Sequence, residues 1–146
     1  MESPGTPDRR FLLFRASGVT YGIALDAVRS VERTVVAPTL PSSSRHVLGF
    51  VNLRGDIAPL FDFASLAGQD SSPSTLEQTC LMIEANEKPV GLAIDETLDH
   101  PLVEEVAPIV GDELFASELQ VGTERVRVVD VEKLIARFDA IGASVA

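Results

Sequence analysis

The chain of 146 residues contains no tryptophan, one tyrosine and one cysteine, and these scarcities exclude several classes of protein. A single cysteine, Cys80, cannot form an internal disulfide, so the fold rests on its apolar core, and the lone thiol suits a reducing compartment. No apolar run approaches the ~20 residues that a membrane-spanning helix needs, and residues 1–10 lack the regions of a secretory signal. We therefore expect a cytoplasmic protein.

Basic residues and metal ligands are also few. The chain carries 12 basic against 22 acidic side chains, a net charge of −10, which disfavours binding to nucleic acid. A zinc site needs three or four ligands, and the chain offers only His46, His100 and Cys80, the last within an apolar stretch that predicts a small buried side chain. There is no glycine-rich phosphate loop and no nucleophile elbow. The sequence predicts no catalytic residue, no metal and no cofactor.

Short apolar runs with strand-like alternation make up most of the chain, and its length predicts one domain with a substantial core. Turn residues separate these runs, among them Ser17-Gly18 and Arg54-Gly55-Asp56. The strand-like stretches are Phe11–Phe14, Tyr21–Leu25, Thr34–Leu40, Val47–Leu53, Ile57–Phe61, Cys80–Ala85, Val90–Ile94 and a hairpin near Val121–Val129.

Helices are predicted to be few and short. Asp26 is expected to cap a helix with Val28 and Val31 on one face, and Asp62 to cap the turn 63–67 before Gly68. Asp130 is expected to cap a final helix with apolar residues at 131, 134, 135 and 138. We expect flexible tails at 1–9 and 139–146, a linker at 69–75, and one domain over 10–138.

The two halves of the chain resemble each other. Residues 11–26 align without a gap on residues 80–95, at an offset of 69, and at an offset of 68 Asp62 and Leu66 match Asp130 and Leu134. Each half thus reads as a unit of short strands that would close into a small barrel, and capping explains the repeated aspartates. Five of the sixteen aligned positions are identical: Leu12/Leu81, Ala16/Ala85, Gly22/Gly91, Ala24/Ala93 and Asp26/Asp95. The predicted fold is all-β with short helices, in which two antiparallel β-barrels share a hydrophobic core.

The segment 46–68, HVLGFVNLRGDIAPLFDFASLAG, resembles the signature of the CheW-like domain. In that family a glycine, an apolar strand and Asn-Leu-Arg-Gly lead into an apolar strand that ends at aspartate. The resemblance extends to 21–28, to 90–95 and to 129–134. It implies two SH3-like five-stranded barrels and a C-terminal helix. It also implies a non-catalytic coupling protein that bridges a CheA-type histidine kinase, through its regulatory domain, to the cytoplasmic tip of a chemoreceptor (methyl-accepting chemotaxis protein).

The resemblance also suggests which residues meet each partner. It implies receptor contacts at Val28, Gly49 and Arg54 and a kinase contact at Gly55. From the same hairpin, we add Asn52 to the candidate receptor contacts and Asp56 to the candidate kinase contacts. Gly55 allows a tight turn, from which the guanidinium of Arg54 projects. The alternative is structural: Arg54 pairs with Asp56 or Asp62 and only fixes the turn.

Two other functions stay open at this point. In residues 100–120 the chain is shorter than is usual in the family and carries an acidic cluster, so a diverged regulator that binds only one of the two partners is the first alternative. A small-ligand-binding β-barrel is a remote second alternative, and it would need an enclosed pocket with convergent polar groups.

Overall fold

The computed structural model describes residues 10–38, 46–70, 77–98 and 105–145. The expected tail 1–9, most of the linker 69–75 and His100 lie outside these ranges. Among the described residues, no helix combines the length and the apolar character needed to cross a membrane.

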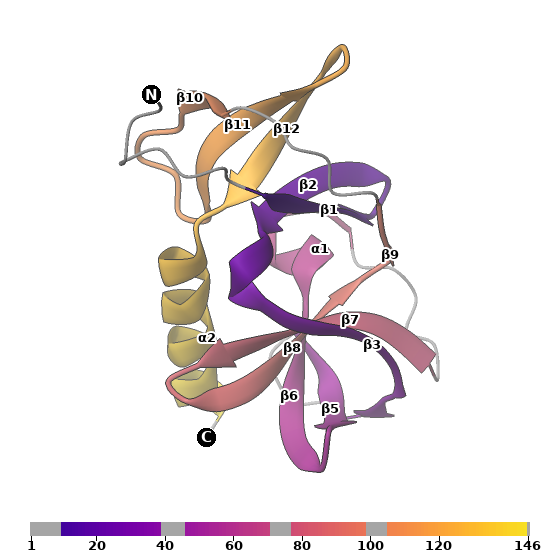
Figure 1. The fold of residues 1–146 in the computed structure, drawn as a ribbon. Coiled ribbons are helices and arrows are strands. Elements are labelled where there is room, and N and C mark those ends of the chain that lie inside the picture. The colour runs from indigo at the N-terminus through magenta and orange to yellow at the C-terminus, as the bar shows by residue number, and fades with distance from the viewer. Residues whose placement is uncertain (1–9, 39–45, 71–76, 99–104, 146) are drawn as a thin grey trace, which may run out of the picture.

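Two six-stranded sheets form the body of the molecule (Figure 1). We call them barrel 1 and barrel 2, and β3 also contacts β5, which closes barrel 2. Barrel 1 has the strand order β10 (Glu105–Pro108), β11 (Phe115–Val121), β12 (Glu124–Val129), β2 (Val19–Ala24), β1 (Phe11–Ala16) and β9 (Glu96–Thr97). Barrel 2 has the order β3 (Val28–Val35), β7 (Glu77–Ala85), β8 (Lys88–Ile94), β6 (Asp56–Asp62), β5 (Val47–Leu53) and β4 (Ala37–Pro38). The all-β prediction is confirmed, with six strands in each sheet where five were expected.

Equivalent segments of the two halves form hairpins with matching strand pairings, but the barrels are not the two halves of the sequence. The hairpin β1–β2 of the first half pairs with β12 of the second half, and β7–β8 pairs with β6 of the first half. These two junctions are parallel, whereas every other described pairing is antiparallel. The halves have therefore exchanged hairpins, which sequence similarity alone does not reveal.

The chain crosses between the barrels at two equivalent points. The first crossing is the 3-10 helix η1 (Leu25–Ala27), and the second is Asp95, between β8 and β9. Asp26 lies in the first crossing, so the repeated pair Asp26 and Asp95 marks both points. Asp95 does not cap a helix: its carboxylate accepts a hydrogen bond from the Ser17 amide at 2.9 Å and so holds the β1–β2 turn.

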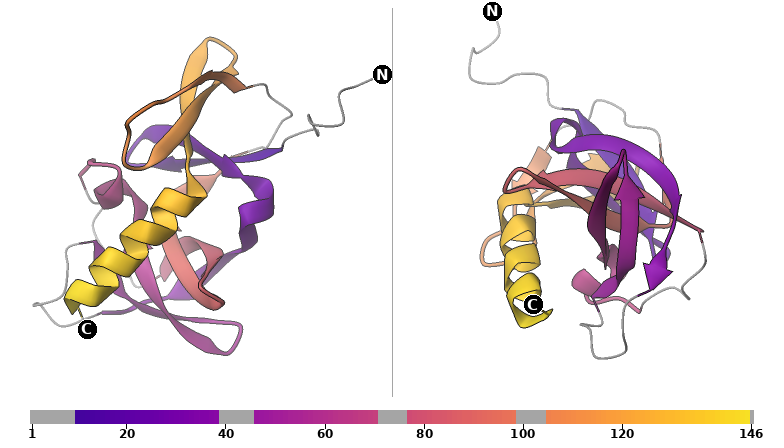
Figure 2. Two further views of the ribbon diagram at one scale, coloured as in Figure 1. Left: turned by 90° about the vertical axis from the view of Figure 1, so that its left-hand side faces the viewer. Right: turned by 90° about the horizontal axis from the view of Figure 1, so that it is seen from below.

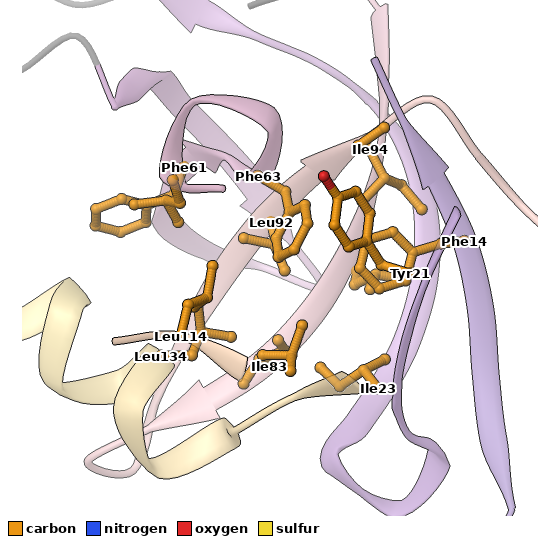
Figure 3. Packing of buried hydrophobic residues seen from close by; sticks show 14 of the residues in the cluster. Phe14, Tyr21, Ile23, Phe61, Phe63, Ile83, Leu92, Ile94, Leu114 and Leu134 are labelled. Atoms are coloured by element: carbon orange, nitrogen blue, oxygen red, sulfur yellow. The ribbon is translucent and has the colours of Figure 1, made fainter. Parts of the chain in front are cut away.

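A shared apolar core lies between the barrels, as predicted. Phe14 and Tyr21 of barrel 1 meet Phe63, with ring centroids 4.9 and 4.8 Å from it (Figure 3). Phe63 begins the short helix α1 (Phe63–Leu66), which is buried throughout. Each barrel also has its own smaller cluster, which contains Leu119 and Val128 in barrel 1 and Leu60 and Val51 in barrel 2. The shared core therefore fixes the two barrels against each other.

Helix α2 (Val131–Val145) leaves barrel 1 after β12 and runs beside barrel 2 (Figures 1 and 2). The Asp130 carboxylate accepts hydrogen bonds from the amides of Glu132 and Lys133 at 3.1 and 3.2 Å, so the predicted cap is confirmed. Phe138 stacks on Phe61 at 4.4 Å. The expectation of a flexible tail over 139–146 was wrong for residues 139–145, because the backbone stays helical through Val145 and Ile141 still reaches the core.

Three other local predictions were wrong. Residues 28–35 form strand β3 and not a helix: pairing with β7 overrides the i, i+3 spacing of Val28 and Val31, and both residues are β-branched. Asp62 precedes α1, but its side chain makes no capping hydrogen bond there. Only the last residue of strand β11, Val121, was predicted to be in a strand. Prolines and acidic residues around β11 obscure its alternation of apolar and polar residues.

Candidate functional site

An open groove runs between the barrels, beside the two crossing points. Its volume is about 710 Å³, and both barrels contribute to it. Most of its lining is aliphatic, while Arg29 contributes a charge at its edge and pairs with Glu84 of β7 at 2.7 Å. The lining residues are Leu12, Leu25, Val28, Arg29, Ser30, Val31, Thr97 and Leu98. We call this the inter-barrel groove.

The six candidate contact residues separate into three places. Val28 lines the inter-barrel groove and is half-buried. Gly49 is buried in β5, next to the shift in register opposite Leu60, so it shapes the strand and presents little surface. The remaining four, Asn52, Arg54, Gly55 and Asp56, lie together and exposed at the end of the β5–β6 hairpin.

The tip of this hairpin is a tight two-residue turn between Leu53 and Asp56. Arg54 and Gly55 have φ values of 55° and 95°, the positive pair typical of a type I′ turn. The Asn52 side-chain oxygen accepts a hydrogen bond from the Gly55 amide at 2.8 Å and holds the turn. The predicted tight turn is confirmed, and Asn52 has a structural role within it.

Arg54 pairs with neither of the two aspartates that we considered as partners. Its Nε donates to Glu32 of β3 at 3.1 Å. The same Glu32 oxygen accepts a hydrogen bond from the Ser30 hydroxyl at 2.8 Å, and the hydrogen bonds from Ser30 and Arg54 lower the pKa of Glu32. Because Ser30 lines the inter-barrel groove, this chain of contacts connects the groove to the hairpin tip.

A second open groove, of about 850 Å³, lies on the outer face of barrel 2 against helix α2. We call it the barrel 2 groove. Phe50 and Ile57 line it and are 45% and 71% exposed, which is unusual for side chains of this size. Neither residue was predicted from the sequence to be a contact residue. The available signal was the hairpin 47–61, in which apolar residues occupy both faces of the strands and not alternate positions only.

The side chains that were considered as zinc ligands have structural roles where the structure describes them. Cys80 is fully buried, as predicted, and burial raises the pKa of its thiol to about 11, so the reactive thiolate is disfavoured. His46 Nδ1 lies 2.5 Å from the Ser65 hydroxyl, a contact that ties the start of β5 to α1. Within the described ranges, no three His, Cys, Asp or Glu side chains are grouped as metal ligands.

Comparison with known proteins adds to this picture. The chain is 28% identical to the probable chemotaxis protein CheW of Rhizobium etli over 92 residues and to the chemotaxis protein CheW of Rhizobium meliloti over 91 residues. These matches cover 63% and 62% of this chain and span 59% of each relative's own length. The crystal structure of the scaffolding protein TtCheW from Thermoanaerobacter tengcongensis has the same fold, with a TM-score of 0.71 at 17% identity. That match covers 85% of this chain and 90% of TtCheW. The family model of the CheW-like domain matches residues 10–139, which include both barrels and most of α2, and the chain therefore belongs to the CheW-like domain family.

Proposed function

We propose that the protein is a non-catalytic cytoplasmic adaptor that couples a CheA-type histidine kinase to the cytoplasmic tips of chemoreceptors. The observation that carries this proposal is the inter-barrel groove, whose aliphatic lining and open form suit the apolar face of a receptor helix. The relatives named above are chemotaxis proteins, and a solved structure of the same fold is described as a scaffolding protein.

The two described grooves favour an adaptor over a ligand-binding barrel. Both are open surfaces, whereas a small-molecule site encloses most of its ligand. They lie on different faces, one between the barrels and one on the outer side of barrel 2, so two partners have separate places to dock. Under this proposal the receptor occupies the inter-barrel groove, and the kinase docks on barrel 2 near Gly55 and Asp56.

The receptor part of the proposal is tested by placing a charge in the groove. Val31 lines the groove and is 45% exposed, while Val35 lies further along the same strand, outside the groove, and is 64% exposed. Val31→Glu is expected to weaken co-sedimentation with receptor-tip assemblies at least tenfold. Val35→Glu is the matched control and is expected to bind as the unmodified protein does. Equal binding by all three proteins would contradict the assignment of the groove.

The bridging part needs both partners. Pull-downs with the receptor fragment alone, with the kinase regulatory domain alone and with both together are expected to give two binary complexes and one ternary complex. Binding of one partner only would replace the adaptor with the one-partner regulator considered above.

A further inference from the structure

We infer that Met82 is an oxidation site, and that its sulfoxide takes the Ser30 hydroxyl away from Glu32. The contacts that connect the inter-barrel groove to the tip of the β5–β6 hairpin are thereby broken. The oxidant is a peroxide, of which hydrogen peroxide is the simplest. The inference does not depend on the proposed function, because it concerns side chains of this chain alone.

Strand β7 places Met82 at the rim of barrel 2, where the interior of the barrel meets solvent. Alternate residues of a strand share a face, and along this face of β7 Cys80 is fully buried, Met82 is partly exposed and Glu84 is exposed. The Met82 side chain packs against the small cluster inside barrel 2, which contains Leu60 and Val51. Its sulfur is therefore held by packing and is still within reach of a small dissolved oxidant.

Met82 is the more reactive of the two sulfur-bearing side chains on this face. Thiol oxidation proceeds through the thiolate, and burial raises the pKa of Cys80 to about 11 and so suppresses that form. Oxidation of a thioether needs no deprotonation. The sequence contains one other methionine, Met1, which serves as a reference for the reactivity of an ordinary thioether.

A single hydroxyl hydrogen has two acceptors at this rim. Ser30 Oγ lies 2.8 Å from Glu32 Oε2 and 3.5 Å from Met82 Sδ, and Ser30 is opposite Met82 in the register of β3 and β7. A hydroxyl donates one hydrogen bond, and a carboxylate is a far better acceptor than a thioether. In the reduced protein the hydroxyl therefore donates to Glu32, and the sulfur lies beside a donor that Glu32 uses.

Oxidation reverses this competition. A sulfur lone pair attacks one oxygen of hydrogen peroxide, and the S–O bond forms as the O–O bond breaks. The other oxygen takes up the proton and leaves as water, so that sulfur is oxidised and the peroxide is reduced. The new sulfoxide oxygen is polar in partly buried surroundings and costs free energy unless a donor reaches it. Ser30 supplies that donor, whereas the Glu32 side chain is 23% exposed and keeps water and Arg54 as partners.

The experiment treats the full chain with dilute hydrogen peroxide and follows each sulfur by peptide mass spectrometry. Met82 is expected to gain one oxygen atom while Cys80 stays reduced. Carboxyl NMR titration of the oxidised protein is expected to show the pKa of Glu32 shifted upward, because the hydrogen bond from Ser30 is the main cause of its depression in the reduced protein. Treatment with methionine sulfoxide reductases A and B and a thiol reductant is expected to restore the lower pKa.

Two variants are the matched controls. Met82→Leu keeps the apolar volume and removes the sulfur. Peroxide is therefore expected to leave the pKa of Glu32 unchanged in this variant, although Met1 is oxidised as in the wild type. Ser30→Ala is expected to be oxidised at Met82 and to show no further rise in the pKa of Glu32, because the donor is already absent.

Each contrary result overturns a named part of the inference. If Met82 stays reduced while Met1 is fully oxidised, Met82 is not an oxidation site. If Met82 is oxidised and the pKa of Glu32 does not move, or moves equally in Ser30→Ala, the hydroxyl is not transferred. A rise in the pKa of Glu32 that also occurs in Met82→Leu would assign the effect to another sulfur and overturn the inference as a whole. The adaptor function stands in all three cases.

Discussion

Gly22 and Gly91 occupy the same position in the two barrels, each at the parallel junction between exchanged hairpins. Gly22 is opposite Val128, and Gly91 is opposite Leu60. A side chain at either residue would point into the small cluster inside its barrel, where neighbouring side chains already approach closely. This explains why these glycines appear as identities between the halves: each allows a strand of one half to cross close to a strand of the other.

The two glycines are expected to differ in their tolerance of alanine. A Cβ atom at Gly91 would lie 3.0 Å from the fully buried Leu60, whereas at Gly22 the nearest atom, on Leu119, is 3.4 Å away. We expect Gly91→Ala to lower the free energy of unfolding by about 1–3 kcal/mol, the usual cost of overpacking. Gly22→Ala is expected to cost less than about 1 kcal/mol. Denaturant midpoints at unchanged m-value measure both, and equal losses would contradict the packing argument.

The Arg54–Glu32 pair is expected to matter for binding more than for stability. The side chains are 69% and 23% exposed, and exposed ion pairs contribute about 0–1 kcal/mol. We expect Arg54→Ala to change the free energy of unfolding by no more than that, while co-sedimentation with receptor-tip assemblies falls. Glu32→Gln with and without Arg54→Ala completes a double-mutant cycle. A loss of several kcal/mol in unfolding would show that the pair is a structural element of barrel 2.

The link between β3 and the hairpin tip is expected to weaken in acid. Hydrogen bonds from Ser30, and then from Arg54, keep the pKa of Glu32 below its ordinary value of 4.5. Since the folded-state pKa is depressed, the stabilisation is fully present above that value and is lost as the pH falls through the lower folded pKa. Carboxyl NMR titration is expected to show a larger upward shift of the Glu32 pKa in Ser30→Ala than in Arg54→Lys, and an unshifted pKa in both would contradict the assigned contacts.

Removal of the Tyr21 hydroxyl group is expected to stabilise the folded protein. The side chain is fully buried, and its oxygen has no hydrogen-bond partner among the described residues. We expect Tyr21→Phe to raise the free energy of unfolding by about 1 kcal/mol, because it removes a buried polar atom and keeps the ring. Tyr21→Leu, which loses the ring contacts with Phe63 and Phe115, is expected to be destabilising. Thermal or denaturant unfolding measures both changes, and a destabilised phenylalanine variant would indicate a hydrogen bond to this oxygen.

Local signals in the sequence predicted the β5–β6 hairpin and the start of α2 well. A glycine at the turn and apolar residues on both sides defined the hairpin, and Asp130 followed by apolar residues at helical spacing defined the helix. Strand β3 was missed because an i, i+3 pair of valines is too short a pattern to separate a helix from a strand. Its identity depends on pairing with β7, which is about fifty residues away in the chain.

The contacts that connect the candidate site could not be predicted from the sequence, because they too join segments that are far apart in the chain. Glu32 meets Arg54 only because barrel 2 closes and brings β3 against β5. Phe50 of β5 is apolar, whereas the equivalent residue of β11, Glu118, is charged. This difference could have been found from the sequence, since the offset of 68 had been found at Asp62 and Asp130. It carries meaning only when the register shows that both residues lie on the same face of equivalent hairpins.

The exchange of hairpins has a consequence for the order in which the protein folds during synthesis. All strands of barrel 2 lie between residues 28 and 94, so they leave the ribosome before β9–β12. Before barrel 2 forms, β1–β2 is an isolated two-stranded ribbon, and such ribbons have little stability in water. Barrel 2 is therefore complete first and offers the first hairpin a partially built core to rest on, and barrel 1 closes only when the last third of the chain emerges.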